Sequence, residues 1–154
     1  MKILILSDTH GEISAAQRII AKEQPHHVIH LGDCLRDAED LERAFPMLPI
    51  CKVPGNNDWF TEEPKEKVIT LCGTNIFLCH GHTTGVKGGY SLQAARALRQ
   101  QCTVSLFGHT HREVLEDADG LILLNPGSIT YGGTYGILTI SPGEAPHAEI
   151  KTDC

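Results

Sequence analysis

The sequence predicts one α/β domain that spans residues 1–154, and three features of the chain support this prediction. Short apolar runs alternate with segments of helical periodicity in the first half, which is the order expected of βαβ units. In the second half, strand-like runs occur in pairs separated by turn residues. No linker, internal repeat or low-complexity tract interrupts the chain, which is long enough to bury one substantial core.

The first half predicts three strands and two helices. Strands are expected at the apolar runs, over residues 3–6, 27–31 and 50–53. Helices are expected over residues 14–24 and 37–45, and a proline directly follows each of them. In a parallel sheet built this way, functional side chains are expected at the carboxyl ends of the strands.

The second half predicts further strands and one helix. The expected strands cover residues 67–71, 76–79, 103–107, 113–116, 121–124, 136–140 and 148–151. The helix is expected over residues 91–101, with Ser91 as its cap. Its core-facing residues are expected to be Leu92, Ala95 and Leu98. Strands from both halves are expected to meet at one cleft.

Side chains of the kind that bind metal ions follow five of the predicted strands. They are Asp8, His10, Asp33, Asn56, His80, His109 and His111. Two carboxylates, one amide oxygen and four imidazoles suit a pair of divalent transition ions, whereas a single zinc would need only three or four of them. Each residue alone has a structural explanation, such as a helix cap or a turn. Their recurrence at strand ends predicts one metal centre.

The composition narrows the class of protein. The content of 41% hydrophobic and 21% charged residues is ordinary, and no apolar run reaches the roughly 18 residues of a membrane span. The N-terminal apolar run is too short for a signal peptide, so a cytoplasmic location is expected. A net charge of −6 argues against a broad nucleic-acid surface. A small phosphoester substrate remains open, because bound cations make an acidic site locally positive.

Five motifs resemble those of a known family. They are Asp8-Thr9-His10, Gly32-Asp33, Gly55-Asn56-Asn57-Asp58, His80-Gly81-His82 and Gly108-His109-Thr110-His111. In this order they resemble the motifs of the calcineurin-like metallophosphoesterases. The chain is most similar to the small prokaryotic phosphodiesterases of that superfamily. The resemblance implies a four-layer α-β-β-α sandwich around a two-metal centre.

The resemblance also implies how the ligands divide and what they do. Asp8, His10 and His111 would bind one metal, Asn56, His80 and His109 the other, and Asp33 would bridge the two. The implied reaction is hydrolysis of a small phosphodiester by a hydroxide that bridges the metals. Mn²⁺ is the expected ion because imidazoles favour borderline transition metals, and Ni²⁺, Zn²⁺, Fe²⁺ and Mg²⁺ are the alternatives.

Three further residues, Asn57, His82 and Asp58, are predicted to act in catalysis. Where this chain has Asn57, the family usually has a histidine that protonates the leaving group, and an amide cannot serve as a general acid. His82 either replaces that acid or is a solvent-facing loop residue. Asp58 would orient an acid partner.

A second class of function is weighed against the enzyme. The retromer small subunit resembles this fold, yet it is a protein-interaction scaffold with an incomplete metal site. All seven ligand positions are filled here, which favours an enzyme. A metal-dependent nuclease is disfavoured by the acidic charge. The physiological substrate, the native metal and the formation of a homo-oligomer are left open by the sequence.

Overall fold

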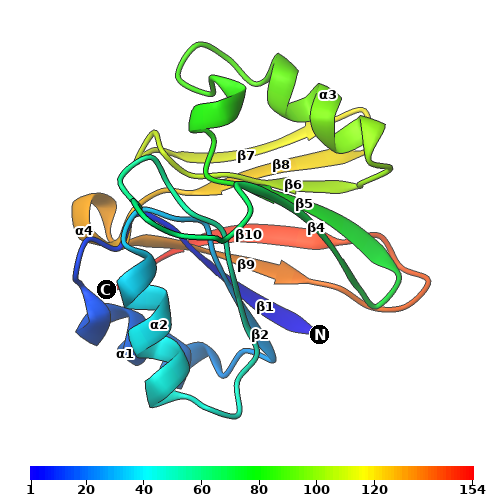
Figure 1. The fold of residues 1–154 in the computed structure, drawn as a ribbon. Coiled ribbons are helices and arrows are strands. Elements are labelled where there is room, and N and C mark those ends of the chain that lie inside the picture. Colours follow the sequence, from blue (N-terminus) through cyan, green and yellow to red (C-terminus); the bar gives the residue numbers. More distant parts are fainter.

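The fold is a four-layer sandwich, as predicted, in a computed structural model that describes residues 1–154. Two five-stranded sheets pack face to face in the middle. Helices α1 (Ile13–Glu23) and α2 (Leu35–Ala44) cover the outer face of one sheet, and α3 (Ser91–Arg99) covers the other, as Figure 1 shows. None of these helices has the length and apolar character that crossing a membrane requires.

The first sheet holds the parallel strands predicted from the βαβ order. Its strands are β1 (Lys2–Leu6), β2 (His27–His30), β3 (Ile50–Lys52), β9 (Thr134–Thr139) and β10 (His147–Thr152). Their order is β10-β9-β1-β2-β3, with β1, β2 and β3 parallel and β9 antiparallel to β1. The carboxyl ends of the three parallel strands therefore lie at one edge of the sheet.

The second sheet is built from the middle of the chain. Its strands are β4 (Glu66–Leu71), β5 (Thr74–Cys79), β6 (Val104–Leu106), β7 (Glu113–Ala118) and β8 (Leu121–Pro126). They lie in the order β4-β5-β6-β8-β7, so the parallel strands β5, β6 and β8 are flanked by antiparallel β4 and β7. Two carboxyl strand ends that carry predicted ligands, those of β5 and β6, are neighbours.

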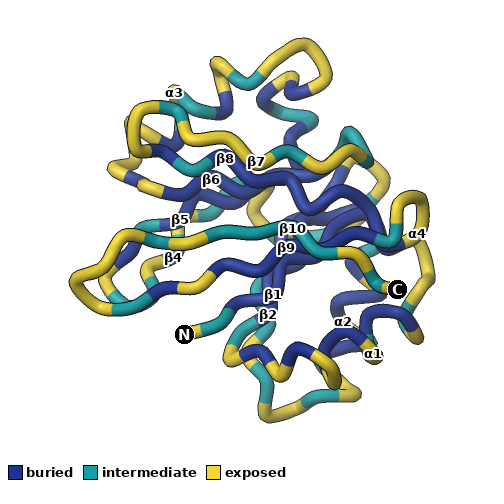
Figure 2. Tube along the Cα trace, turned by 180° about the vertical axis from the view of Figure 1, so that it is seen from behind, coloured by how far each residue is buried: buried dark blue, intermediate teal, exposed yellow.

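Alternation of side chains along the strands separates three layers of core. Ile3 and Ile5 of β1 face the other sheet and join the central cluster, whereas Leu4 and Leu6 face the helices. A third cluster between the second sheet and α3 includes Phe107. The tube in Figure 2 is buried through the middle of both sheets and exposed mainly at loops and helix surfaces. Continuous apolar runs are what strands buried on both faces require.

The prediction for the third helix is wrong in detail. Its buried residues are Gln93 and Ala97, while Leu92 and Leu98 are 47% and 56% exposed. Gln93 can be buried because both ends of its amide are hydrogen-bonded: the nitrogen donates to Ser105 Oγ (2.8 Å) and the oxygen accepts from the Thr84 hydroxyl (2.6 Å). Burying this amide turns the leucines to the outside.

The helix start also differs from the prediction, and two short elements were not predicted. Tyr90 is the N-cap residue of α3 and no side chain caps that end, so Ser91 is not the cap. The 3₁₀ turn η1 (His82–Thr84) and the helix α4 (Ile129–Gly132) are too short for a periodic sequence signal.

Candidate metal centre

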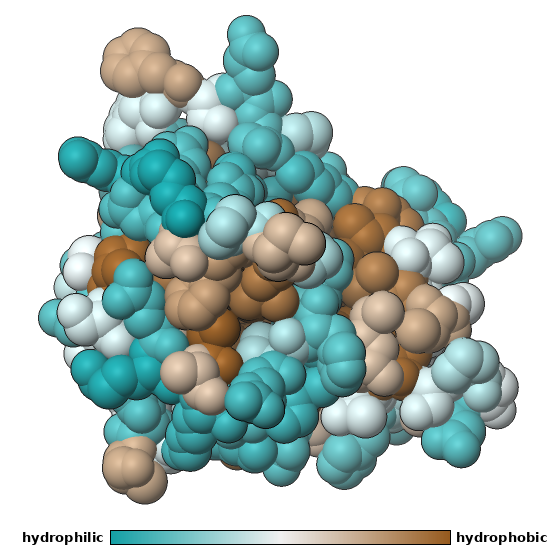
Figure 3. All heavy atoms as spheres, turned by 90° about the horizontal axis from the view of Figure 1, so that it is seen from below, coloured by the Kyte–Doolittle hydropathy of each residue, from teal (hydrophilic) through white to brown (hydrophobic).

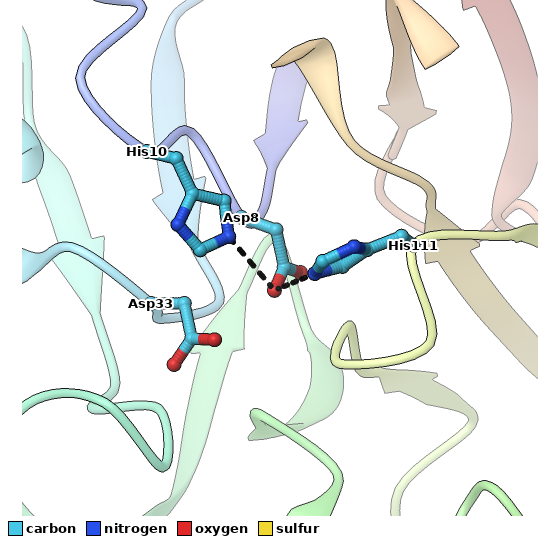
Figure 4. A group of neighbouring side chains, drawn as sticks. All are labelled: Asp8, His10, Asp33 and His111. Carbon is cyan, nitrogen blue, oxygen red and sulfur yellow. Dashed lines mark hydrogen bonds and ion pairs between the residues drawn. The ribbon is translucent and has the colours of Figure 1, made fainter. Parts of the chain in front are cut away.

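The predicted ligands of both sheets converge where the carboxyl ends of β1, β2, β5 and β6 meet. Asp8, His10, Asp33 and His111 can each direct one ligand atom into a group whose atoms all lie within 4.8 Å of one another. Figure 4 shows the rings of His10 and His111 facing the carboxylate of Asp8, with the carboxylate of Asp33 close by. The residues are up to 103 positions apart in the sequence, so the fold creates this cluster.

Asp8 lies at the middle of the group. Its fully buried carboxylate oxygen Oδ1 lies 3.1 Å from Nε2 of His111, 3.8 Å from Nε2 of His80 and 4.0 Å from Nε2 of His10. The other oxygen, Oδ2, accepts hydrogen bonds from the Ser7 hydroxyl (2.5 Å) and the backbone N–H of His109 (3.1 Å). One oxygen is thus held by the protein while the other faces three imidazoles, an arrangement suited to a shared cation.

Asp33 connects this group to His80. Its Oδ1 lies 3.5 Å from His80 Nε2 and accepts the backbone N–H of Asn57 (3.1 Å), and its Oδ2 accepts from Asn57 Nδ2 (2.9 Å). Burial alone would raise the pKa of Asp33, but His80 and the hydrogen bonds from Asn57 lower it below its usual value. The side chain is therefore an ionised carboxylate that lies beside His80 and within 4.8 Å of ligand atoms of His10 and His111.

The hydrogen bonding of His80 shows that the residues fit a metal ion. Its Nδ1 lies 2.7 Å from the carbonyl oxygen of Leu31, which can only accept, so Nδ1 carries the proton. Nε2 is fully buried, has no hydrogen-bond partner and faces the carboxylates of Asp8 and Asp33. A buried nitrogen without a hydrogen-bond partner that faces two carboxylates marks a position suited to a cation. An imidazole oriented by a backbone carbonyl is the usual second-shell arrangement of a metal ligand.

His109 and His82 lie beside His80. The ring of His109 is 5.0 Å from that of His80 between centroids, and the ring of His82 is 5.5 Å from His80 and 6.1 Å from His109. Burial, reinforced by the positive charge that His80 can carry, lowers the pKa of His109 to about 4. The same two causes lower the pKa of His82. Both rings are therefore neutral near pH 7, the state in which imidazole binds metals.

The Gly55–Asp58 loop carries the remaining predicted residues. Asn56 is exposed there and its side chain makes no hydrogen bond within the chain. The carboxylate of Asp58 accepts three backbone N–H groups, from Cys34 (3.0 Å), Leu35 (2.8 Å) and Gly55 (2.8 Å). Asp58 thus ties this loop to the start of α2, next to Asp33.

The backbone at the centre is strained in a way the sequence did not reveal. Five of the predicted ligands have left-handed φ angles, which non-glycine residues rarely adopt. They are Asp8 (53°), His10 (43°), Asp33 (55°), His109 (71°) and His111 (58°). Each angle turns the chain sharply at the end of a strand and aims the side chain into the centre.

Gly108 allows the two sheets to approach at this point. A Cβ atom built on it would lie 2.0 Å from Ser7 Oγ and 2.9 Å from Asp8 Oδ2. The absence of a side chain therefore lets the end of β6 lie against the end of β1.

Comparison with known proteins agrees with this geometry. A sequence model described as the calcineurin-like phosphoesterase superfamily domain matches residues 1–145. The chain belongs to this superfamily. The probable metallophosphoesterase YsnB of Bacillus subtilis is 34% identical, with 91% of this chain and 85% of YsnB covered. The phosphodiesterase MJ0936 of Methanocaldococcus jannaschii is 30% identical, with 91% and 90% covered.

Solved structures confirm the fold of this phosphoesterase-superfamily chain. The zinc complex of Vps29 from Entamoeba histolytica has a TM-score of 0.78 at 20% identity and covers 98% of both chains. A structure described as a novel archaeal phosphodiesterase has a TM-score of 0.72 at 26% identity, covering 98% of this chain and all of the other. The same architecture thus occurs in Vps29 and in a phosphodiesterase.

Sequence reasoning missed one aromatic residue of the phosphoesterase centre. Tyr131 of α4 stacks on His111, with centroids 4.7 Å apart and planes 11° from parallel, and it meets His10 edge-on at 5.5 Å. Ser128 caps this helix through the backbone N–H of Tyr131 and donates to the carbonyl of Asp8 (2.8 Å). The segment Asn125-Pro126-Gly127-Ser128, which has the composition of a turn, is the only sequence signal near this contact.

Proposed function

We propose that this protein is a dinuclear metal-dependent phosphodiesterase. Membership of the calcineurin-like phosphoesterase superfamily supports a phosphoester hydrolase, and relatives named as phosphodiesterases favour diester substrates. The observation that carries the proposal is the buried, unpartnered Nε2 of His80 facing Asp8 and Asp33. In this proposal Asp8, His10 and His111 hold one metal, Asn56, His80 and His109 hold the other, and Asp33 contacts both.

The residues around the proposed centre would bind and orient rather than attack. When bound, a pair of divalent ions activates water and stabilises charge on a phosphoryl group. Asn57, whose amide donates to Asp33, holds that carboxylate in place and presents the rest of its polar surface to the substrate side. The lowered pKa of His82 leaves its ring neutral near pH 7, so it offers one N–H donor and little acid strength.

Asp58 has a positioning role in this proposal, because backbone donors occupy both of its oxygens. Mn²⁺ is the proposed ion, since four imidazoles favour borderline transition metals over Mg²⁺. Three statements remain predictions from the sequence: a cytoplasmic location, a single functional domain over residues 1–154, and the formation of a homo-oligomer.

Chelation followed by metal restoration tests the proposal. The chelated, dialysed protein is expected to lose hydrolysis of bis-p-nitrophenyl phosphate, and Mn²⁺ or Ni²⁺ is expected to restore it better than Mg²⁺. His80→Ala should lower both metal content and rate, while His147→Ala, at an exposed position, is the matched control. A sample shown by elemental analysis to be metal-free that keeps its full rate would refute the two-metal proposal.

A scaffold function is the second candidate, and one surface feature favours it. Figure 3 shows apolar side chains gathered in patches on the face beneath α1 and α2. Near this end of the fold, an apolar hollow of about 490 Å³ is lined by residues that include Phe45, Met47 and Leu48. Apolar patches of this kind can mark protein-binding surfaces. Full metal occupancy without turnover of any phosphoester would favour this candidate over the enzyme.

A further inference from the structure

A large hollow opens beside the candidate metal centre. It has a volume of about 830 Å³ and lies between the start of α2 and the 57–63 loop. Asn57 lines it and also donates two hydrogen bonds to Asp33, so this residue connects the hollow to the proposed metal site. Leu35, Trp59 and Phe60 supply its apolar surface. A group attached to a phosphate at the metal centre would therefore extend into this hollow.

Two aromatic rings stand exposed in the hollow. Trp59 is 76% exposed and Phe60 is fully exposed, which is unusual for large aromatic side chains. Phe60 also has a left-handed φ of 59°, a strained conformation for a bulky residue. On one side of these residues the loop is held by the three backbone contacts of Asp58. On the other it is held by a 2.6 Å ion pair between Glu63 and Lys67. The rings are thus presented to solvent on an anchored loop.

The free charges in the hollow are mixed in sign. Lys52 and Glu63 line it but are paired with Glu42 and Lys67, both at 2.6 Å. Asp58 also lines it, but its carboxylate accepts three backbone N–H groups. The charged side chains that remain without an ion pair or backbone contact are Arg36, Glu39 and Glu62. One guanidinium donor and two carboxylate acceptors suit a neutral, planar group with both hydrogen-bond donors and acceptors. They do not suit an extended polyanion or an aliphatic chain.

We propose that this hollow binds the nucleobase of a nucleoside-containing phosphodiester. The inference rests on the proposed function, because it places the ester phosphate at the metal centre. The base would stack on Trp59 and Phe60, since every base has a π face that aromatic side chains can bind. Trp59 follows Asn57 by two residues, a separation of at most about 7 Å along the chain, which the sugar of a nucleoside can bridge.

Substrates that share one leaving group but differ in the other ester group distinguish binding in the hollow from the hydrolysis step. Metal-loaded protein is assayed with thymidine 5′-(p-nitrophenyl phosphate), ethyl p-nitrophenyl phosphate and phenyl p-nitrophenyl phosphate, all of which release p-nitrophenolate. Trp59→Ala is expected to raise KM for the thymidine ester by about 5- to 150-fold, the usual value of one stacked base. The rate with the ethyl ester should stay unchanged. Trp59→Phe should retain most of the preference for the thymidine ester.

Leu98→Ala is the matched control, because it removes an exposed apolar side chain of α3 that does not line the hollow. Trp59 is the only tryptophan of the chain, so its fluorescence provides a binding assay that does not depend on turnover. Thymidine monophosphate is expected to quench this fluorescence saturably, and ethyl phosphate is not.

Several results would overturn the subsite without overturning the enzyme. Equal KM changes for all three esters in Trp59→Ala, or an equal preference for the phenyl and thymidine esters, would remove the nucleobase assignment. A change in the sedimenting mass of Trp59→Ala with unaltered kinetics would make the rings a protein contact instead. If no ester is hydrolysed, the proposed function fails, and quenching by thymidine monophosphate still decides whether the subsite exists.

Discussion

Acidification is expected to destabilise the fold through one buried ring, that of His30. In the folded protein its Nδ1 accepts the N–H of Gly32 (3.2 Å), so its Nε2 carries the proton and donates to Thr9 Oγ1 (3.0 Å). Thr9 Oγ1 in turn donates to Asp37 (2.5 Å). The neutral ring satisfies both nitrogens, and protonating Nδ1 would break the bond from Gly32. Burial lowers the pKa of His30 from 6.5 to about 4, outweighing the nearby carboxylate of Asp37.

The sign and size of the effect follow from this pKa. Between pH 6.5 and 4 the unfolded chain binds a proton at His30 that the folded chain does not, so stability falls as the pH falls. Each unit of pH in this range costs about 1.4 kcal/mol. Moving from pH 7 to pH 5 should therefore cost about 2 kcal/mol from this residue, which for a domain of this size is a shift of roughly 4–8 °C in Tm.

Unfolding of the chelated protein in urea at pH 7 and pH 5 provides the assay. Wild type is expected to lose about 2 kcal/mol more than His30→Gln between these pH values, because glutamine does not titrate. His82 and His109 are present in both proteins, so their contributions cancel in the difference. His147→Gln, at an exposed histidine, should behave as wild type. Identical losses in wild type and His30→Gln would refute the reasoning.

Three further predictions concern the centre itself. Asp33→Asn should lower the occupancy of both metals together, and His111→Ala mainly the occupancy of one, as measured by elemental analysis. Two metals per chain in Asp33→Asn would contradict the proposal that Asp33 binds both ions. Asn57→His should reduce the dependence of the rate on leaving-group acidity, because a general acid is worth roughly 10²–10⁴-fold for poor leaving groups. If the rate of Asn57→His depends on leaving-group acidity as steeply as that of wild type, across aryl and alkyl esters, the introduced histidine does not act as a general acid. Gly108→Ala should lower the free energy of unfolding by about 1–3 kcal/mol, because the added Cβ would lie 2.0 Å from Ser7 Oγ. A urea midpoint equal to that of wild type would exclude this clash.

The sequence predicted the order of the main elements because strands buried on both faces need unbroken apolar runs. The run from Ile3 to Leu6 is such a case, with two residues facing each core layer. It also predicted that Asp8, His10 and Asp33 would meet, since carboxyl ends of neighbouring parallel strands lie together, and that His111 would join them at a cleft shared by strands of both halves. The first inference depends on local periodicity, and the second on the order of the strands and on the family motifs.

What the sequence could not predict depends on contacts between distant residues. The outward turn of Leu92 and Leu98 follows from the burial of Gln93, whose partners lie on η1 and β6. The stacking of Tyr131 on His111 requires α4, a helix of four residues without a periodic signal. Left-handed backbone at the ligands is a property of the strand-end turns. Asp and His adopt it more often than most residues, but their presence alone does not predict it.

The position of β9 and β10 has a consequence for how the centre forms during synthesis. Every predicted ligand lies between residues 8 and 111, but β1 gains its second neighbour only when β9, over Thr134–Thr139, has been made. Until then an apolar strand edge next to Asp8 is uncovered, a situation that favours aggregation. The hydrogen bond from Ser128 to Asp8 is also made late. A ribosome-bound chain that is stalled after residue 111 would therefore contain all the predicted ligands. It would lack β9 and Ser128, which support the end of β1 and the loop that carries Asp8.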